Sequence, residues 1–491
     1  MFINKLMLNG LLAFTFFHAN GIEPFSNTTQ KPLSFNKAIS TAQANDPWLT
    51  GNVNQQRSIE YMSQAATSLP DPKVSINMAN LPVNGFDFSQ EGMTQAQVGI
   101  SQVFPRGDTL KIKSEQLKTQ SEMYPYQREN RKSQVAVTVG SLWLDAYRVQ
   151  ESITLIETNR ALFEQLVQIS EASYSSALGK TRQQDIVRAQ LELTRLDDRL
   201  DILQQQQSSF EGLLSQWLVN LSQENDSGNS NDITDTSYDS IIADLALFHF
   251  NLSSQLPDVD LLNHELIYQS NELKPNQLVA FFINHPSIIA IEKKVDASKT
   301  GISLAKQKYK PEWGVNASYG YRADDFDGRG RADLFSVGVT FDLPLFTENK
   351  QDKEVKSAIH QTEAVKTEKL LMLKQFIGSF ASAKGRLLRL KNRQHLYKTK
   401  LLPQMHDQVE AALVAYTNND GDFSEVVRSR IAVLNTEIED LALNVEEQKI
   451  HLELNYLLVG SVKVARVKST HYENHKSMTN SSQSTAILGE K

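Results

Sequence analysis

Apolar and polar residues alternate strictly along four short segments of the chain. The alternation occurs twice within 73–104 and twice within 312–343, where Val337 and Val339, for example, are separated by Gly338. A period of two, with one apolar and one polar face, predicts β-strands. Strands of about nine to eleven residues with these two faces fit a transmembrane β-structure. The same pattern also fits a pair of soluble hairpins, and both interpretations stay open.

A different rhythm follows each predicted hairpin. In 105–221 the apolar positions recur in alternating steps of three and four, which is the seam of a helix that packs on another helix. The seam consists of Val139, Leu142, Ala146, Val149, Ile153, Ile156, Phe163 and Val167, then Ala189, Leu193, Leu196, Leu200, Leu203, Phe210, Leu214, Trp217 and Leu221. The same layout in 344–460 predicts a second long helical hairpin. Pro403 lies inside it and is expected to bend or break the helix.

The chain contains one structural unit written twice. "VGISQVFP" begins at Val98 and "VGVTFDLP" begins 239 positions later at Val337. Other landmarks recur in the same order at nearly the same displacement: "NDPWL" at Asn45 and "NHPSI" at Asn284, Tyr174 and Tyr416, and Gly179 and Gly421. Such self-similarity indicates duplication of a whole unit. Each copy is predicted as helix, strand, strand and long helical hairpin.

This repeat divides the chain into nine predicted segments. They are a signal peptide (1–21), an N-terminal segment with the first helix (22–72), a first β-hairpin (73–104), a first long helical hairpin (105–221), a polar equatorial insertion (222–275), the first helix of the second repeat (276–311), a second β-hairpin (312–343), a second long helical hairpin (344–460) and a polar, disordered tail (461–491). The predicted fold class is an α+β membrane protein.

The N-terminus predicts export. Lys5 precedes an apolar run from Leu11 to Phe17, and small residues follow at Ala19 and Gly21, as in a signal peptide cleaved near Gly21. An N-terminal anchor helix is the alternative, although the apolar run is too short to span a bilayer. If the strands enter lipid, four per chain cannot close a barrel, because an open edge leaves backbone groups unpaired and closed barrels need about eight strands. The chain is then expected to oligomerise.

Composition excludes several function classes. The net charge is −7, which gives no basic surface for nucleic acid, and the absence of cysteine excludes thiolate chemistry. No catalytic motif occurs, so we predict no enzyme, no catalytic residue, no cofactor and no metal site. His471 and His475 have the spacing of a zinc pair in a helix, or are incidental. The acidic run from Asp324 resembles a short part of a calcium loop, or is a charged outer loop.

Several dispersed motifs carry a family resemblance. "LPDPKVSINMANLP" begins at Leu69, "VGISQVFP" at Val98, "YSSALGKTRQQDIVRAQLEL" at Tyr174 and "LLPQMHDQVEAALVAY" at Leu401. On these motifs the chain resembles the TolC-like outer-membrane efflux family over nearly its whole length. The segment after Leu69 resembles the heavy-metal efflux branch. The resemblance implies a homotrimer, with a twelve-stranded barrel in outer-membrane lipid and a twelve-helix periplasmic α-barrel.

The resemblance also implies partners and a location. The protein would lie in the Gram-negative outer membrane with a periplasmic extension, and it would dock with a periplasmic adaptor and an inner-membrane transporter of RND type. It would serve as a passive exit duct of a tripartite efflux system, with heavy-metal cations as one cargo. A type I secretion duct and a non-channel periplasmic coiled-coil scaffold are the alternatives.

The candidate site is the periplasmic tip of the helical hairpins. Its turns are marked by Tyr174 and Gly179 in the first repeat and by Tyr416 and Gly421 in the second. Beyond each turn, Asp185 with Arg188 and Glu425 with Arg428 follow an acid-x-x-Arg pattern, which puts both side chains on one helical face. We interpret these residues as a charged periplasmic gate, or as ordinary solvated pairs. Because Arg428 is basic, we do not expect the narrowest part of the tunnel to be lined by acidic side chains alone.

Overall fold

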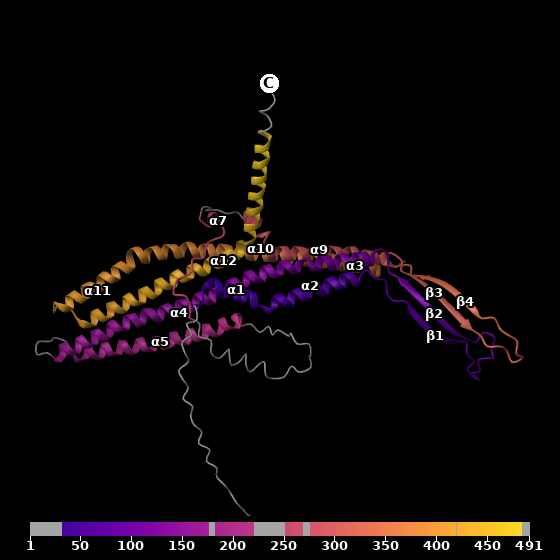
Figure 1. Ribbon diagram of the computed structural model, residues 1–491, viewed down its shortest axis with the longest axis horizontal. Coiled ribbons are helices and arrows are strands. Elements are labelled where there is room, and N and C mark those ends of the chain that lie inside the picture. The colour runs from indigo at the N-terminus through magenta and orange to yellow at the C-terminus, as the bar shows by residue number, and fades with distance from the viewer. Residues whose placement is uncertain (1–31, 176–181, 220–250, 269–274, 419, 484–491) are drawn as a thin grey trace, which may run out of the picture.

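The protein is a long, curved body with a β-sheet at one end and helices along the rest of its length (Figure 1). The computed structural model describes residues 32–175, 182–219, 251–268, 275–418 and 420–483. The predicted signal peptide therefore lies outside the described residues, as do most of the predicted insertion and Gly179. The described elements follow the predicted order of helix, strand, strand and long helical hairpin, twice over.

The two predicted hairpins join into one sheet. It contains β1 (Lys73–Ala79), β2 (Gln95–Phe104), β3 (Trp313–Tyr321) and β4 (Leu334–Phe341), in the order β1-β2-β3-β4 and antiparallel throughout. The central pairing, β2 with β3, joins the two repeats, since Val98 lies opposite Tyr319. Both outer strands are edges, because β1 and β4 each have one neighbour in the described sheet.

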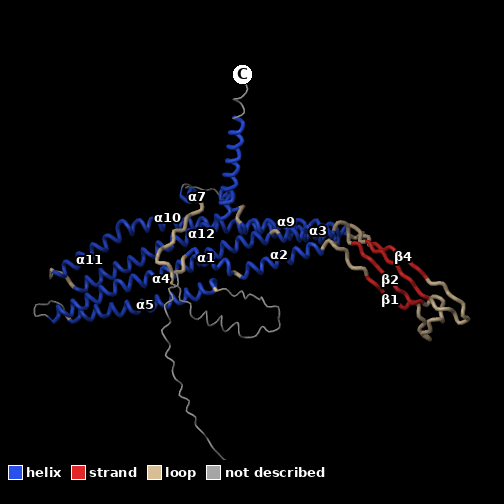
Figure 2. The backbone as a smooth tube through the Cα atoms, in the orientation of Figure 1, coloured by secondary structure: helices blue, strands red, loops and turns tan. Residues whose placement is uncertain are grey.

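Four helices continue the sheet in the same order. α2 (Pro47–Ala65) packs on α3 (Thr109–Ser121), α3 packs on α9 (Pro286–Lys306), and α9 packs on α10 (Gln351–Leu396). Figure 2 shows these helices leading directly into the strands. The helical layer, like the sheet, therefore has two outer members, which are α2 and α10.

The other end of the molecule is built from the two long hairpins. α4 (Met123–Ser175) pairs with α5 (Gln183–Leu218), and α11 (Leu402–Thr417) pairs with α12 (Phe423–Gln483). α4 also packs on α12, so the order across this layer is α5-α4-α12-α11. α4 and α11 end, and α5 and α12 begin, at the end of the molecule far from the sheet (Figure 1).

Buried side chains form three clusters along the helical part. The predicted seam is largely buried, with Val139, Ile156 and Leu214 fully enclosed. One cluster surrounds Trp143, which packs edge-on against Phe35 of α1 (Phe35–Asn45) at 5.6 Å between ring centroids. Among the described residues, none of the three clusters contains a strand residue. The sheet therefore has no hydrophobic core of its own.

Two prolines interrupt the long helices, one of them at a place that the sequence analysis did not predict. The first long helix divides into α3 and α4 at Glu122, because Pro125 has no N–H to donate to the carbonyl of Ser121. In the second repeat, five residues of π-helix, Tyr397–Leu401, separate α10 from α11 just before Pro403. The predicted interruption at Pro403 is therefore confirmed, and it takes the form of a π-turn.

Two further differences concern the ends of the repeats. The predicted first helix is two helices, because Asp46 and Pro47 end α1 and begin α2. At the other end α12 continues to Gln483, where the sequence predicts a disordered tail from 461. Residues 461–483 contain no glycine or proline, so nothing in their backbone chemistry terminates a helix.

Part of the predicted insertion is described. Residues 251–268 form an extended segment followed by the short helix α7 (His264–Tyr268), and α8 (Pro275–Phe282) leads into the second repeat. The extended segment crosses both repeats: Tyr147 of α4 donates its hydroxyl to Ser254 O at 3.3 Å, and Asn455 of α12 donates to Asp260 O at 2.7 Å.

Candidate functional site

One face of the sheet is an apolar surface in which Gln102, opposite Val315, is the one strongly polar side chain of the described strands. Residues that lie opposite each other in the register share a face, and the register aligns Val98 with Tyr319 and Val315 with Val339. All large apolar side chains on this face are exposed: Val74, Ile76, Met78, Val98, Ile100, Phe104, Trp313, Val315, Tyr319, Tyr321, Phe335, Val337, Val339 and Phe341. Ile76 retains 81% of its accessible surface. An apolar patch of this extent indicates an interaction surface.

Aromatic side chains concentrate at both ends of this apolar face. At the helical end Trp313 and Phe341 pack with ring centroids 5.0 Å apart. At the loop end Tyr321 stacks on Phe88 at 6.3 Å. Tyr319 and Phe335 form a further aromatic row at the loop end, and the two rows between the aromatic ends are aliphatic apart from Gln102. Two aromatic belts around an aliphatic band are typical of strands that cross a membrane.

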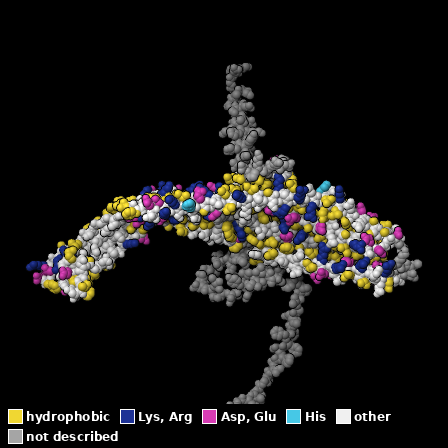
Figure 3. All heavy atoms as spheres, turned by 180° about the vertical axis from the view of Figure 1, so that it is seen from behind, with side chains coloured by type: hydrophobic (Ala, Val, Ile, Leu, Met, Phe, Trp, Pro, Cys, Tyr) yellow, Lys and Arg dark blue, Asp and Glu magenta, His cyan; other side chains and the backbone are white. Residues whose placement is uncertain are grey.

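The opposite face of the sheet is polar and small. It carries Ser, Asn, Gln and Thr side chains beside four glycines, with few apolar residues, and Gln97 of β2 donates to the Ser318 hydroxyl of β3 at 2.8 Å. Figure 3 views the molecule from behind, and there the sheet on the left is mostly white between the charged side chains at its two ends. The sheet is therefore strongly two-sided.

Ion pairs join the repeats where the strands meet the helices. Arg106, just after β2, pairs with Asp342, just after β4, and also donates to Lys308 O at 2.9 Å. Lys310, just before β3, pairs with Asp108 at 3.0 Å. Each contact links a residue of the first repeat to one of the second. These charges balance one another, so the junction is anchored without a net charge from these two pairs.

The loops at the far end of the sheet are also linked across the repeats. Arg322 donates to Gly92 O and Arg331 to Glu91 O, each at 3.1 Å. The acidic run from Asp324 is part of this loop, and one carboxylate oxygen of Asp325 accepts backbone N–H groups within the loop itself. Among the described residues, no group of three or more His, Asp or Glu side chains is arranged to hold a metal ion.

The two acid-x-x-Arg motifs at the hairpin tips have different structures. Asp185 is 9% exposed, and its carboxylate accepts the backbone N–H of Arg182 at 3.0 Å, so it caps the start of α5 as the acidic residue of a capping box. Glu425 instead pairs with Arg428 at 2.7 Å, and both side chains are exposed, by 43% and 71%. Arg188 is exposed as well. The same spacing therefore gives a buried cap in one repeat and a surface ion pair in the other.

The second hairpin turn is tight and closed by aromatic packing. Tyr416 and Phe423 pack across it with ring centroids 5.5 Å apart. A Cβ on Gly421 would lie 2.9 Å from the Cβ of Ala415 and 3.0 Å from the Tyr416 nitrogen, so the turn requires glycine. Tyr174 is 53% exposed in the first repeat. Its predicted companion Gly179 lies outside the described residues.

The sequence landmarks "NDP" and "NHP" prove to be buried polar anchors. Asp46 caps α2 through the Trp48 N–H at 3.1 Å and binds Arg131 of α4 at 2.7 Å. In the second repeat His285 takes its place. Its Nε2 lies 2.9 Å from Tyr456 O and its Nδ1 accepts the Ser287 N–H. The sequence indicates both motifs only as markers of the repeat. The anchoring role of Asp46 and His285 could not be predicted, because their partners Arg131 and Tyr456 are distant in sequence.

Burial controls the protonation of His285. Its side chain is fully enclosed, and desolvation lowers its pKa from 6.5 to about 4, against an opposing effect of the Tyr456 carbonyl. The imidazole is therefore neutral at neutral pH. Because Nδ1 accepts from Ser287, the ring proton resides on Nε2, which donates to Tyr456 O.

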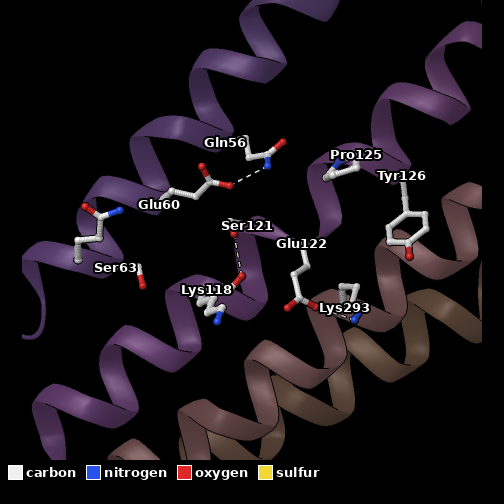
Figure 4. Close-up of a pocket in the computed structure, with 10 residues that line it drawn as sticks. Gln56, Glu60, Ser63, Lys118, Ser121, Glu122, Pro125, Tyr126 and Lys293 are labelled. Carbon is white, nitrogen blue, oxygen red and sulfur yellow. Dashed lines mark hydrogen bonds and ion pairs between the residues drawn. The ribbon is translucent and has the colours of Figure 1, made fainter.

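A hollow of about 690 Å³ lies between α2, α3, α4 and α9, beside the helix break at Pro125 (Figure 4). Lys293 and Glu122 meet in it at 2.6 Å, and Glu60 accepts from Gln56 at 2.7 Å. Its two lysines, Lys118 and Lys293, balance its two glutamates. It offers no set of convergent groups that would define a ligand.

No helix in the described part of the chain is long and apolar enough to cross a membrane. His471 and His475 lie on the last part of α12, where side-chain positions are not described, so their zinc-pair spacing stays a prediction.

Comparison with solved structures identifies the class of fold. The CmeC outer membrane channel of Campylobacter jejuni aligns with a TM-score of 0.65 over 87% of this chain and 85% of that one, at 12% identity. The open state of the MtrE outer membrane channel of Neisseria gonorrhoeae gives 0.64 over 87% and 89%, at 13% identity. The outer membrane protein VceC of Vibrio cholerae gives 0.62 over 86% and 95%, at 13% identity.

The chain therefore has the fold of the TolC-like outer-membrane channels, and the resemblance seen in its sequence is confirmed at the level of the fold. These three solved proteins are outer-membrane proteins. No family model and no curated protein sequence matches the chain. Because the sequence identity to these structures is low, the function of this chain has to be argued from its own residues.

Proposed function

We propose that this chain is one subunit of a homotrimeric outer-membrane exit duct, in which the sheet crosses the lipid and the helices form a periplasmic tunnel. The observation that carries the proposal is the two-sided sheet, whose apolar face is covered by none of the described residues. Each Val, Ile or Phe side chain moved from water to lipid contributes about 1.5 to 3 kcal/mol. A sheet with so many exposed apolar side chains favours a membrane over solution.

The sheet and both helical layers have outer elements that pack on only one side, which supports lateral association of identical copies. The outer elements are β1 and β4 in the sheet, α2 and α10 in the adjoining helices, and α5 and α11 near the tips. Exposed apolar side chains lie on these elements, including Tyr61 and Met62 on α2, Leu370 and Leu371 on α10, and Val187 on α5. In lipid an unpaired strand edge costs several kcal/mol per backbone group, so β1 of one copy is expected to pair with β4 of the next.

Three copies would give twelve strands and a continuous helical wall below them. Such a duct needs no enzyme activity and no cofactor, and it would take its cargo from an inner-membrane transporter, of RND type, through a periplasmic adaptor. The cargo includes heavy-metal cations on the resemblance of the segment after Leu69. These partners and this cargo are proposals that rest on the family resemblance.

Two alternatives make different demands on the sheet. A type I secretion duct would use the same architecture with another transporter. A periplasmic coiled-coil scaffold would leave the sheet in water, which its exposed apolar face disfavours.

Fractionation followed by mass measurement tests the proposal. The mature protein should sediment with outer membranes, require detergent for extraction, and give the mass of a trimer in detergent. Recovery in the soluble periplasmic fraction would support the scaffold, and a monomer as the sole species in detergent would contradict the trimer.

A further inference from the structure

The polar face of the sheet carries almost no ionisable side chain. In the four strands its residues from Ser75 onward are Ser, Asn, Gln, Thr, Gly, Ala, Val and Leu. Lys73 is the one exception, and it lies at the first position of β1, next to the helical junction. Charged residues instead gather beyond both ends of the strands, at the Arg106–Asp342 junction and in the far loops.

The glycines of the strands all lie on this same face. Gly99, Gly314, Gly320 and Gly338 each lie beside a polar side chain from a neighbouring strand. Thr340 Oγ1 is 2.6 Å from where a Cβ of Gly314 would be, and Asn316 Oδ1 is 2.8 Å from that of Gly338. The polar side chains therefore lie flat over the glycines instead of standing away from the sheet.

We propose that this face is the lining of the exit lumen and that it is an uncharged wall of flat-lying polar side chains, which admits solutes of either charge equally. The inference rests on the proposed function, since it requires the polar face to line a pore. It adds a statement about selectivity: the part of the lumen lined by the strands would not select cargo by charge. Any such selection would come from the helical tunnel or the transporter.

The chemistry of the wall explains why it would not discriminate. A fixed charge attracts one sign of ion and repels the other, and at about 4 Å in water this changes local concentrations about fivefold. Hydroxyl and amide groups both donate and accept hydrogen bonds, so they solvate cations and anions alike. The glycines let these groups lie against the backbone and leave the space above the wall open.

The experiment uses the natural absence of cysteine, which gives labelling without background. Ser318→Cys is placed in the full-length protein, reconstituted in liposomes. Its reaction rates are measured with a cationic and an anionic methanethiosulfonate reagent. The ratio of the two rates, divided by the same ratio for free 2-mercaptoethanol, should lie within about threefold of one, because no fixed charge is nearby.

Three variants make the result decisive. Ser336 lies opposite Ser318 in the register, so adding Ser336→Asp to Ser318→Cys should raise the normalised ratio at least about fivefold in favour of the cationic reagent. Gly338→Ala should lift Asn316 from the wall and slow both reagents at Ser318→Cys by the same factor. Gly385→Ala, on α10 with no atom near its Cβ, should leave both rates unchanged.

The outcomes separate this inference from the proposed function. Val337→Cys on the apolar face should resist both reagents in liposomes, and labelling as fast as Ser318→Cys would overturn the membrane assignment itself. If Val337→Cys is protected but Ser318→Cys prefers one reagent about tenfold, the uncharged wall is wrong. Unchanged rates in Gly338→Ala would reject the flat-lying arrangement.

Discussion

Asp46 binds Arg131 at 2.7 Å, and Arg131 in turn lies over the Trp48 and Trp217 rings at 5.7 and 5.4 Å. The Asp46 side chain is 3% exposed and that of Arg131 is 30% exposed, so the ion pair links α2 to α4 through a buried carboxylate. In the second repeat the equivalent residue is His285, which makes neutral hydrogen bonds instead. The duplicated position thus keeps its role as an anchor while its chemistry differs.

Replacing Asp46 separates the helix cap from the ion pair. Asp46→Ala should destabilise the protein by about 2 to 3 kcal/mol, because it removes the cap of α2 and leaves Arg131 without its carboxylate. Asp46→Asn should cost less, since the amide oxygen can still accept the Trp48 N–H. Thermal unfolding followed by circular dichroism measures both, with exposed Asp71→Ala as the control. An Asn variant as stable as wild type would mean that the ion pair contributes nothing.

His285 should make the stability depend on pH. Its pKa is about 4 in the folded protein against 6.5 when exposed, so below pH 6.5 the unfolded chain binds a proton that the folded chain rejects. The stabilisation is fully present above pH 6.5 and is lost as the pH falls toward 4, up to about 3 kcal/mol.

The variant His285→Gln isolates this effect. It should be less stable than wild type at pH 7, and the difference between the two should shrink as the pH falls from 6.5 to 4. Denaturant unfolding in detergent at a series of pH values measures the difference. His360→Gln, at an exposed position, should track the wild type throughout. A constant difference between wild type and His285→Gln would show that the imidazole does not titrate on unfolding.

The Glu425–Arg428 pair is the part of the tip that still fits a gate. Each exposed contact contributes only about 0.2 to 1 kcal/mol, and threefold symmetry would repeat it around the tip. Replacing both residues with Ala should raise single-channel conductance in planar bilayers. High salt should shift the wild type in the same direction, because it screens the charges.

A matched control is available for the gate. Asp296 and Lys299 form a similarly exposed pair at 2.9 Å on α9 and should be replaceable by Ala without effect on conductance. Equal conductance in the Glu425 and Arg428 double variant, with the trimer intact, would leave that pair as solvated surface. Asp185→Ala should instead destabilise the start of α5 by about 1 kcal/mol, as expected for a capping residue.

Gly421→Ala should disturb the turn between α11 and α12. The added methyl group would approach backbone atoms of Ala415 and Tyr416 to 3.0 Å, and backbone cannot swing aside as a flexible side chain can. Limited trypsin digestion should then cleave faster near Arg428 and Arg430 than in wild type. Gly385→Ala meets no atom and should leave the digestion pattern unchanged. Identical digestion of Gly421→Ala and wild type would contradict a tight turn.

The sequence predicted the candidate tip but not its chemistry. Spacing alone gave Asp185 and Glu425 the same role, whereas one caps a helix and the other pairs with Arg428. A carboxylate three residues from an arginine can turn to the arginine or to a free backbone N–H. Which of these two partners the carboxylate binds depends on where the helix begins. The start of a helix is set by the preceding turn and by packing.

Local periodicity by itself determined the strands, the helical seams and the duplication, because alternation every two residues and steps of three and four are properties of the chain's own geometry. The helix break at Pro403 was also predictable from the sequence, because the missing N–H of a proline removes a hydrogen bond within its own helix. Only the tertiary structure decided that β2 pairs with β3, that Asp46 meets Arg131, and that His285 is buried. These contacts join residues far apart in sequence, so they depend on how whole elements pack, which no local pattern encodes.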